Sequence, residues 1–229
     1  MKMQKVKHLK DERAKITPNV LYEYMVSEKI DGWYVYADFD KYDGWSDIKS
    51  SAGRFIPSMK HAREDLEQLG NQASSCRLIM EAYIPDTPFH ITNGIFNRTI
   101  APCEAQDVKF KMHDLIWLDR PEESAFARYT RLEQLGETER LELHSLLAIT
   151  SEEDRWEYLF NRVVMNGGEG IILKQVNGSY QAGKRNSSLM KMKQELTLDL
   201  EIIDCYTSIG AKGIEATNLT LIRQNGVEI

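Results

Sequence analysis

The chain has 229 residues, of which 42% are hydrophobic and 28% charged, so it can bury a core and has the composition of a globular protein. At about 150 residues per domain, this length allows one large domain and a fragment of a second. Three cysteines without a C-x-x-C pair indicate neither a disulfide framework nor a zinc site, and they favour a reducing compartment. The formal charge of −6 argues against a protein that binds nucleic acid by electrostatics alone.

The N-terminus carries lysines without the apolar stretch of a secretory signal, and no apolar run reaches membrane-spanning length. We therefore expect a cytoplasmic chain with no membrane partner. Charge is unevenly placed along the chain. Acidic residues dominate from position 122 to 157, whereas the charged residues from 181 to 194 are all basic. The basic stretch is either a phosphate-binding face or an ordinary solvated surface.

Alternating and β-branched runs in the first half predict strands over residues 22–26, 33–39, 47–50, 77–83 and 109–118. The first two flank Gly32 and predict either a hairpin or two sequential strands joined by a tight turn. A helix is predicted from Ser58 as N-cap to Gly70, because Met59, Ala62 and Leu66 share one stripe.

The middle of the chain, residues 128–167, is predicted to be helical, with Ser151 and Asp154 as a capping pair and an apolar face that ends at Gly167. Strands are then predicted over 170–175 and 189–193. Beyond position 195 the pattern changes to two strands, 198–206 and 216–223, which indicate a second, all-β piece.

The first chemical motif is K-x-D-G at positions 29–32, placed at a strand end where a loop can present a side chain to a cleft. Lys29 becomes a nucleophile if its surroundings favour the neutral amine. Taken alone, the motif is more simply interpreted as a turn without catalytic meaning.

Two further motifs follow a domain length away. E-G-x-x-x-K places Glu169 and Lys174 at the two ends of a short strand, and K-x-K places Lys191 and Lys193 on one strand face, suited to gripping phosphates. Taken alone, E-G-x-x-x-K is more simply interpreted as a core strand with polar ends, and K-x-K as a solvated strand face. The three motifs in this order, separated by a domain length, form a specific pattern that indicates a shared chemical site.

On these residues the sequence resembles the covalent nucleotidyltransferases, which comprise ATP-dependent DNA ligases, RNA ligases and mRNA capping enzymes, and within them the phage-type DNA ligases. The segment 50–57 with Arg54 is similar to the ligase Ser-Arg-x-Gly segment, Glu81 ends a strand like the family's ribose or metal contact, and His113 lies where the family places an aromatic ring over the purine. The stretch 89–98 favours a DNA ligase over a capping enzyme. Tyr34 and Ser51 stand where many of these ligases have arginine.

The resemblance implies an α+β fold: an adenylation domain of antiparallel sheets flanked by helices at residues 1–195, followed by an incomplete OB-fold domain at 196–229. It implies the cofactors ATP and Mg²⁺, with catalysis by Lys29, Lys174, Lys191 and Lys193 and metal binding by Glu81 and Glu169. The nucleotide is expected to contact Ser27, Glu28, Lys29, Arg54, Glu81, His113, Glu169, Lys174, Lys191 and Lys193.

The implied reaction is the sealing of nicked duplex DNA by a monomer, through AMP carried on Lys29, in a bacterial or phage-infected cell. An RNA ligase or capping-type transferase and a non-catalytic nucleic-acid-binding module remain as alternatives. An OB barrel needs five strands, and only two are predicted. We therefore expect the 229 residues to be part of a longer polypeptide, or a polypeptide whose OB-fold domain has been cut.

Overall fold

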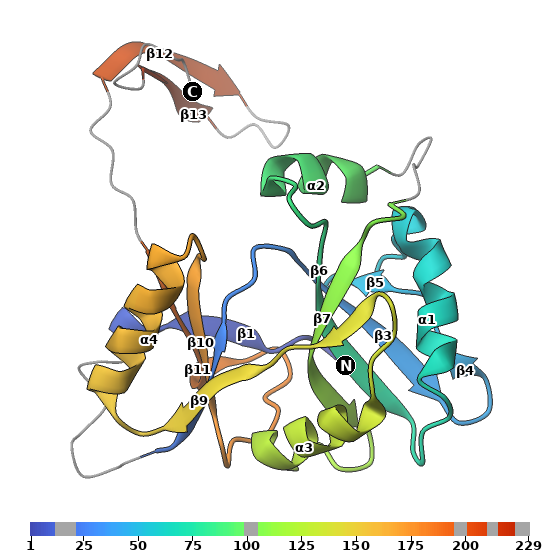
Figure 1. Ribbon diagram of the computed structural model, residues 1–229. Helices are drawn as coiled ribbons and strands as arrows, with labels where there is room; N and C mark the ends of the chain where they lie inside the picture. Colours follow the sequence, from blue (N-terminus) through green and yellow to red (C-terminus); the bar gives the residue numbers. More distant parts are fainter. Residues whose placement is uncertain (12–21, 99–104, 195–200, 210–214, 223–229) are drawn as a thin grey trace. The chain divides into compact units, whose positions relative to one another are not determined.

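The computed structural model describes residues 1–11, 22–98, 105–194, 201–209 and 215–222. The chain divides into two compact units, Met1–Lys193 and Gln194–Ile229. The first unit contains two sheets with helices packed against them (Figure 1). Within the described part of the chain, no helix is long and apolar enough to cross a membrane.

The first sheet has five strands in the order β1 (Lys5–His8), β11 (Arg185–Lys193), β10 (Gly170–Gln175), β2 (Tyr24–Glu28) and β9 (Leu146–Thr150). Its neighbours are antiparallel except for β1, which runs parallel to β11. Helix α4 (Glu153–Met165) covers one face of this sheet (Figure 1). The core between them is formed by Val26, Leu173 and Met190 of the strands and Trp156 and Leu159 of the helix.

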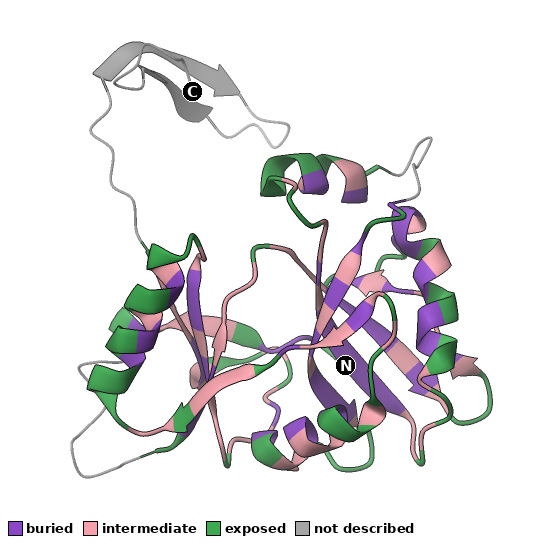
Figure 2. Cartoon of the chain, viewed as in Figure 1, coloured by how far each residue is buried: buried purple, intermediate pink, exposed green. Residues whose placement is uncertain are grey.

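The second sheet follows the order β4 (Gly44–Trp45), β3 (Trp33–Asp40), β6 (Cys76–Tyr83), β7 (Lys109–Trp117) and β8 (Leu141–Leu143), and β5 (Lys49–Ser50) also pairs with β3. Its main core includes apolar residues of a 3-10 segment (Pro57–Ala62), α1 (Arg63–Gln68), α2 (Phe89–Phe96) and α3 (Ala125–Leu135). The inner strands of this sheet are largely buried (Figure 2).

The chain passes from one sheet to the other between β2 and β3. The hairpin alternative for these strands is wrong, because β2 pairs with β9 and β10 whereas β3 pairs with β4, β5 and β6. The alternative of two sequential strands is confirmed. As a result, the K-x-D-G motif lies in the segment that connects the two sheets.

Two predicted helical regions need correction. The segment after Ser58 begins as a 3-10 helix with Pro57 in its first turn and Ile56 at the N-cap, and the Ser58 side chain is buried. Proline fits the first helical turn because its missing N–H has no partner to lose there, so the helix starts earlier than the serine predicts.

The middle of the chain is not continuously helical. Strands β8 and β9 lie between α3 and α4, and the predicted capping by Ser151 is wrong because the N-cap is Glu152, without a side-chain cap bond. The helical prediction fails at β9, since a short apolar run has no distinct period and its pairing with β2 decides its structure. Strand β1, 3-10 helix η1 (Leu9–Asp11) and helix α2 were also not predicted.

The second unit contains β12 (Glu201–Ile209) and β13 (Glu215–Ile222), which pair as antiparallel neighbours. Both match predicted strands, although the predicted start at 198–200 and the end at 223 lie outside the described residues.

Candidate active site

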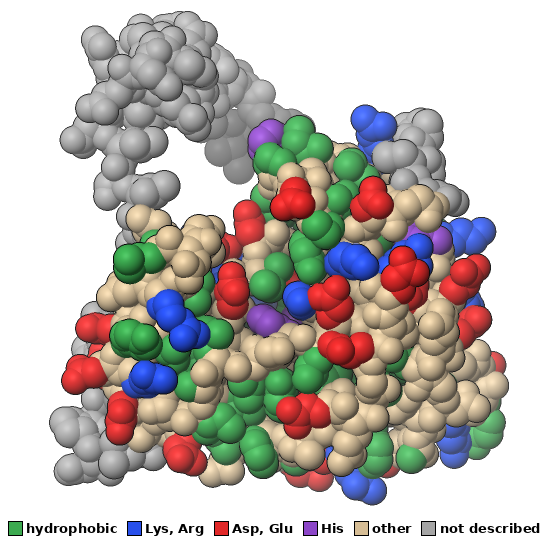
Figure 3. Space-filling model, in the orientation of Figure 1, with side chains coloured by type: hydrophobic (Ala, Val, Ile, Leu, Met, Phe, Trp, Pro, Cys, Tyr) green, Lys and Arg blue, Asp and Glu red, His purple; other side chains and the backbone are tan. Residues whose placement is uncertain are grey.

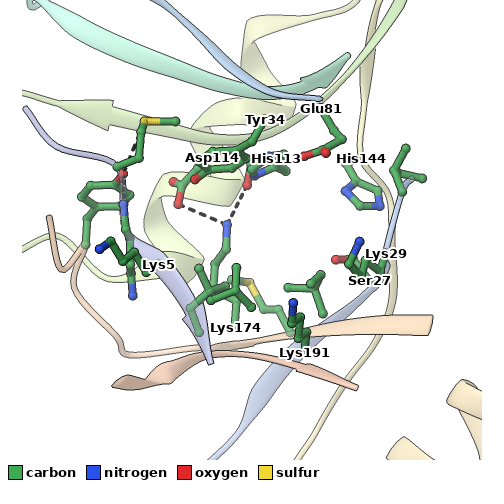
Figure 4. Close-up of a pocket in the computed structure, with 18 of the residues that line it drawn as sticks. Lys5, Ser27, Lys29, Tyr34, Glu81, His113, Asp114, His144, Lys174 and Lys191 are labelled. Atoms are coloured by element: carbon green, nitrogen blue, oxygen red, sulfur yellow. Dashed lines mark hydrogen bonds and ion pairs between the residues drawn. The ribbon is translucent and has the colours of Figure 1, made fainter. Parts of the chain in front are cut away.

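A cavity of about 690 Å³ lies between the two sheets of the first unit. The first sheet contributes Ser27, Lys29, Lys174 and Lys191 to its wall, and the second contributes Tyr34, Glu81, His113 and Asp114 (Figure 4). In the view of Figure 3, acidic and basic side chains gather around a histidine near the middle of this unit. The cavity is therefore lined by lysine side chains on the first sheet and by aromatic rings and carboxyl groups on the second.

Strand register explains the charged wall. Ser27, Ile172 and Lys191 lie opposite one another across β2, β10 and β11, and Met25, Lys174 and Leu189 form the next row. All six line the cavity. The residues between the two rows point to the other face, where they pack on α4, because side chains alternate along a strand. The register of the three strands thus turns both Lys174 and Lys191 toward the cavity.

The first two motifs meet at Lys29. Its backbone N–H donates to the carbonyl of Gly170 over 2.8 Å, and its Nζ donates to the Glu169 carboxylate. The two side chains are 21% and 28% exposed, so this ion pair lies at the edge of the cavity, within reach of solvent. Lys29 and Glu169 are 140 residues apart in sequence, and the pairing of β2 with β10 brings them together.

Glycines in these motifs allow the close approach of backbones. A Cβ at Gly32 would lie 2.5 Å from the carbonyl oxygen of Ala82, and one at Gly170 would lie 2.1 Å from that of Met192. Gly170 also has a φ of 151°, which L side chains rarely adopt. The glycines of D-G and E-G are therefore required by packing at the site.

Glu81 extends from β6 toward the same place. Burial raises the pKa of its carboxyl to about 8; Lys29 acts against this shift, whereas Glu169 and Asp31 add to it. Burial and the charge of Glu169 likewise raise the pKa of Asp31. Three carboxyl groups thus interact with the Lys29 ammonium, and Glu81 holds a proton more readily than an ordinary glutamate.

A β-bulge shapes the opposite wall. Asp114 pairs with Ile79 and Met112 with Met80, so His113 is the extra residue on β7. Both His113 and Asp114 line the cavity, because a bulge turns successive side chains away from strict alternation. The His113 ring stacks on Tyr34, with centroids 5.3 Å apart and planes inclined by 23°. Burial, together with the charge of Lys174, lowers the pKa of His113 well below its usual value, so the ring is neutral.

Lys174 is held by a buried network. Its Nζ donates to the carbonyl of His113 over 2.7 Å and to Oδ2 of Asp114 over 3.1 Å. Asp114 also accepts from Nε and Nη2 of Arg128, over 2.8 and 3.2 Å. Burial alone raises the pKa of Asp114, but Lys174 and Arg128 hold it below its usual value. The carboxylate is ionised and fixes Lys174 in position.

The N-terminal strand closes one end of the cavity and was missed by the sequence analysis. Lys2 and Lys5 line the cavity beside Arg185. Gln4 anchors the strand, since its N–H donates to the Tyr180 hydroxyl over 2.8 Å and its side chain to Ser188 over 3.0 Å. The only sequence signal was the concentration of lysines at the N-terminus, which carries no information about this pairing.

The predicted site residues do not all border the cavity. Ser27, Glu28, Lys29, Glu81, His113, Lys174 and Lys191 line it, together with Tyr34 and Ser51. Glu169 is joined to it through Lys29. Lys193 lies outside the lining but acts electrostatically on Asp31 and Lys191.

Arg54 is exposed in the turn after β5, where its carbonyl accepts from the Ser50 N–H over 2.8 Å, and it is not part of the wall. The turn therefore brings Ser51, and not Arg54, to the cavity.

Burial and the neighbouring Lys193 and Lys29 lower the pKa of Lys191.

The donors beside Lys29 fit a hard divalent cation only in part. Among the described residues, no group of three or more His, Cys, Asp or Glu side chains is arranged to hold a metal ion. Mg²⁺ is commonly held by one or two carboxylates together with substrate phosphates, and Glu81 and Glu169 supply two carboxylates here. The chemistry of this pair fits Mg²⁺ once a phosphate is present.

Comparison with known proteins places this cavity in a family. Residues 64–193 match the model of the ATP dependent DNA ligase domain. The DNA ligase of Enterobacteria phage T4 is 29% identical over 125 residues, which are 50% of this chain and 26% of that protein. DNA ligase 1 of Korarchaeum cryptofilum is 30% identical over 131 residues, or 55% and 24% of the two chains. The matched region thus spans about a quarter of these curated relatives.

Solved structures agree on the fold. A Lig E DNA ligase superposes with a TM-score of 0.73 at 20% identity, over 100% of this chain and 82% of that one. The ATP-dependent DNA ligase of bacteriophage T7, in complex with ATP, superposes with a TM-score of 0.66 at 16% identity, over 98% and 78%. Together with the family model, which matches more than half of the sequence, these findings show that the chain belongs to the ATP-dependent DNA ligase domain family.

Proposed function

We propose that this chain carries the nucleotidyl-transfer centre of an ATP-dependent DNA ligase. The neutral amine of Lys29 attacks the α-phosphate of ATP, a phosphoramidate P–N bond forms, and a proton leaves the nitrogen as the bond from the α-phosphorus to pyrophosphate breaks. The AMP then passes to the 5′-phosphate of a nick in duplex DNA, and the 3′-hydroxyl displaces AMP to seal the strand. The observation that carries the proposal is the position of Lys29, which is paired with Glu169 at the edge of a cavity lined by Lys174 and Lys191.

The lysines of the charged wall stabilise the phosphates. Negative charge on the phosphoryl oxygens is present in each step, so preorganised ammonium groups lower the barrier most when they need not move. Lys174 meets this condition, since Asp114 and the His113 carbonyl hold its Nζ before a nucleotide arrives. Lys191 and Lys193 add positive charge from one face of β11.

The opposite wall binds the base. His113 stacks on Tyr34 with one face, and the ring borders the cavity, so a purine can stack on its other face. The histidine replaces the aromatic ring expected from the family, and its lowered pKa leaves it uncharged for stacking.

Glu81 and Glu169 would hold Mg²⁺ together with the phosphates of ATP, and the metal would supply charge neutralisation of the leaving pyrophosphate. Glu169 has a second role that needs no metal, because its carboxylate orients the Lys29 amine. Glu81 would release its proton when a cation binds, since its pKa of about 8 reflects a buried carboxyl.

The wider assignment follows the same proposal. Residues 1–195 act as the adenylation domain and 196–229 begin an OB-fold domain, of which β12 and β13 are two strands. The partner is nicked duplex DNA, the protein acts as a monomer in the cytoplasm of a bacterial or phage-infected cell, and it serves DNA repair, replication or recombination.

The test uses the full chain with α-labelled ATP and magnesium, followed by denaturation. Label retained on the denatured protein supports nucleotidyl transfer to a side chain, and its absence contradicts the proposal. The adenylated protein is then given nicked DNA and, separately, RNA ends. Transfer of the label to the 5′-phosphate of nicked DNA is expected, whereas transfer to RNA alone indicates an RNA ligase.

A further inference from the structure

The N-terminal segment, residues 1–8, joins the two walls of the cavity at the end away from Lys29. Its strand β1 pairs with β11 of the first sheet. Before that strand, the side chain of Met3 is 8% exposed and packs in one cluster with Ile79 of the second sheet. Lys5 of this segment and Lys29 lie on opposite sides of Lys174 (Figure 4). The chain itself therefore joins the two sheets beside Lys29, whereas non-covalent contacts of the N-terminal segment join them at the other end.

One buried hydroxyl lies at the centre of this second junction. Tyr180 follows β10 in the chain and is 6% exposed. Its hydroxyl accepts from the N–H of Gln4 over 2.8 Å, is hydrogen-bonded to the hydroxyl of Tyr34 on β3, and donates to Sδ of Met3 over 3.9 Å. A tyrosine hydroxyl has one proton to donate and lone pairs to accept with, so these three contacts are compatible with one another. The hydroxyl of Tyr180 thus connects the N-terminal segment to the second sheet.

Further bonds fix the same segment at both of its ends. Nη1 of Arg77 on β6 donates to the carbonyl of Met1, and the guanidinium is itself held by Asp38 over 2.6 and 2.9 Å. The side-chain amide of Gln4 donates to the Ser188 hydroxyl of β11 over 3.0 Å. The segment is consequently fixed to the second sheet at residue 1 and to the first sheet at residue 4.

The junction leads directly to a lysine of the charged wall. The ring of Tyr34 stacks on His113, and the carbonyl of His113 accepts from Nζ of Lys174. A displacement of Tyr34 would therefore displace the carbonyl that holds this ammonium group. Tyr180 is in this way connected to Lys174 through Tyr34, by contacts between buried or half-buried side chains.

We propose that Tyr180 is a positioning residue for the transfer of AMP to Lys29. Through Tyr34, its hydroxyl holds the second wall at the spacing at which Lys174 faces the phosphates. The inference rests on the proposed function, since it takes this transfer to be the reaction of the cavity. A misplacement of about 1 Å at a distance from the reacting atoms can lower a rate by about 10². Loss of the hydroxyl should therefore slow the transfer itself.

The experiment measures single-turnover labelling of the full chain by ATP and magnesium over a range of ATP concentrations, at a temperature at which every variant is folded. Tyr180→Phe keeps the ring and removes the hydroxyl, and its maximal rate should fall by about tenfold or more. A residue that only stabilises the fold would lower the melting temperature and leave this maximal rate unchanged. Tyr34→Phe should also slow labelling. The double variant should be no slower than Tyr180→Phe alone, because the bond between the two hydroxyls is lost only once.

The control is Tyr24→Phe, the same change at a tyrosine that is 3% exposed, lies outside the cavity lining and donates to the carbonyl of Ser187 over 3.3 Å. It should be labelled at the original maximal rate. If Tyr180→Phe does not fold, Tyr34→Phe, which keeps the bond from Gln4 to Tyr180, takes its place.

Three results would overturn the inference and leave the proposed function intact. They are original maximal rates in Tyr180→Phe and Tyr34→Phe, a double variant in which the two losses multiply, and a Tyr24→Phe chain slowed as much as Tyr180→Phe. An unaltered chain that takes no label would overturn the proposed function and this inference with it.

Discussion

The two walls of the cavity differ in how their side chains are held. On the five-stranded sheet, Lys29 and Glu169 form a pair at the rim that is more than a fifth exposed on both sides. On the other sheet, Asp114 is nearly inaccessible and bonded to Arg128, which is 2% exposed. The rim pair can exchange partners with a substrate, whereas the buried network holds Lys174 and His113 in place. Chemistry at this site is therefore carried by the exposed wall and preorganised by the buried one.

The comparison predicts that breaking the buried network harms stability most. Asp114→Asn leaves Arg128 and Lys174 without a carboxylate, and we expect a loss of about 3–5 kcal/mol in the free energy of unfolding. Glu142→Gln, which removes the half-exposed partner of Lys111, should cost less than about 1 kcal/mol. Denaturant unfolding of the two variants measures the contrast, and equal losses would show that the Asp114 network is not a scaffold.

Removing the carboxylate of the rim pair should lower the rate of labelling strongly and the free energy of unfolding only slightly. Glu169→Gln leaves Lys29 without its ionic partner, so the rate of protein labelling by ATP should fall by about 10². The free energy of unfolding should change little, because both side chains are partly exposed. Single-turnover labelling and thermal unfolding of the same preparation give both numbers. A variant that labels at the original rate would remove Glu169 from the site.

The glycine that joins the rim to the sheet should tolerate no side chain. Gly170→Ala places a Cβ 2.1 Å from the Met192 carbonyl, and we expect a destabilisation of about 2 kcal/mol with loss of labelling. Gly94→Ala, in helix α2 with no atom within 4 Å of the new Cβ, should be neutral or stabilising. Thermal unfolding of both variants checks the pair, and a neutral Gly170→Ala would contradict the register at β10.

A smaller effect concerns pH. The pKa of Glu81 is about 8 in the folded chain, against an ordinary 4.5, so the native state binds more protons between these values. Stability from this group is full below about pH 4.5 and is lost as pH rises toward 8. Glu81→Gln cannot lose it, so the melting temperature of the variant relative to the original should rise by a few degrees from pH 5 to pH 8. A difference that is constant with pH would show that Glu81 is ordinarily ionised.

The charged wall could be predicted from sequence because its information is local. K-x-D-G, E-G-x-x-x-K and K-x-K each occupy one strand or strand end, and alternation along β11 places Lys191 and Lys193 on one face. The order of the three motifs along the chain carries their resemblance to one superfamily. Family membership and the α+β class are confirmed.

The other wall could not be predicted, because it depends on pairings between distant residues. The bulge that turns both His113 and Asp114 inward appears only when β6 and β7 are paired. The strand β1 is anchored by a bond from Gln4 to Tyr180, 176 residues away. His144 lies between β8 and β9, in a region that the sequence pattern predicts to be helical, and its place beside His113 depends on the contact of its backbone with Met112.

The most direct test of the account is to locate the adenylyl group after reaction with ATP and magnesium, by mass spectrometry of the digested full chain. We predict one adenylyl group, carried by Lys29, and no modification of the Lys29→Ala or Lys29→Arg variant, because alanine has no amine and guanidinium stays protonated. Lys10→Ala, at an exposed residue outside the cavity lining, should be modified like the original. An adenylyl group on Lys174 or Lys191, or one that persists in Lys29→Ala, would contradict the assignment of Lys29 as the acceptor.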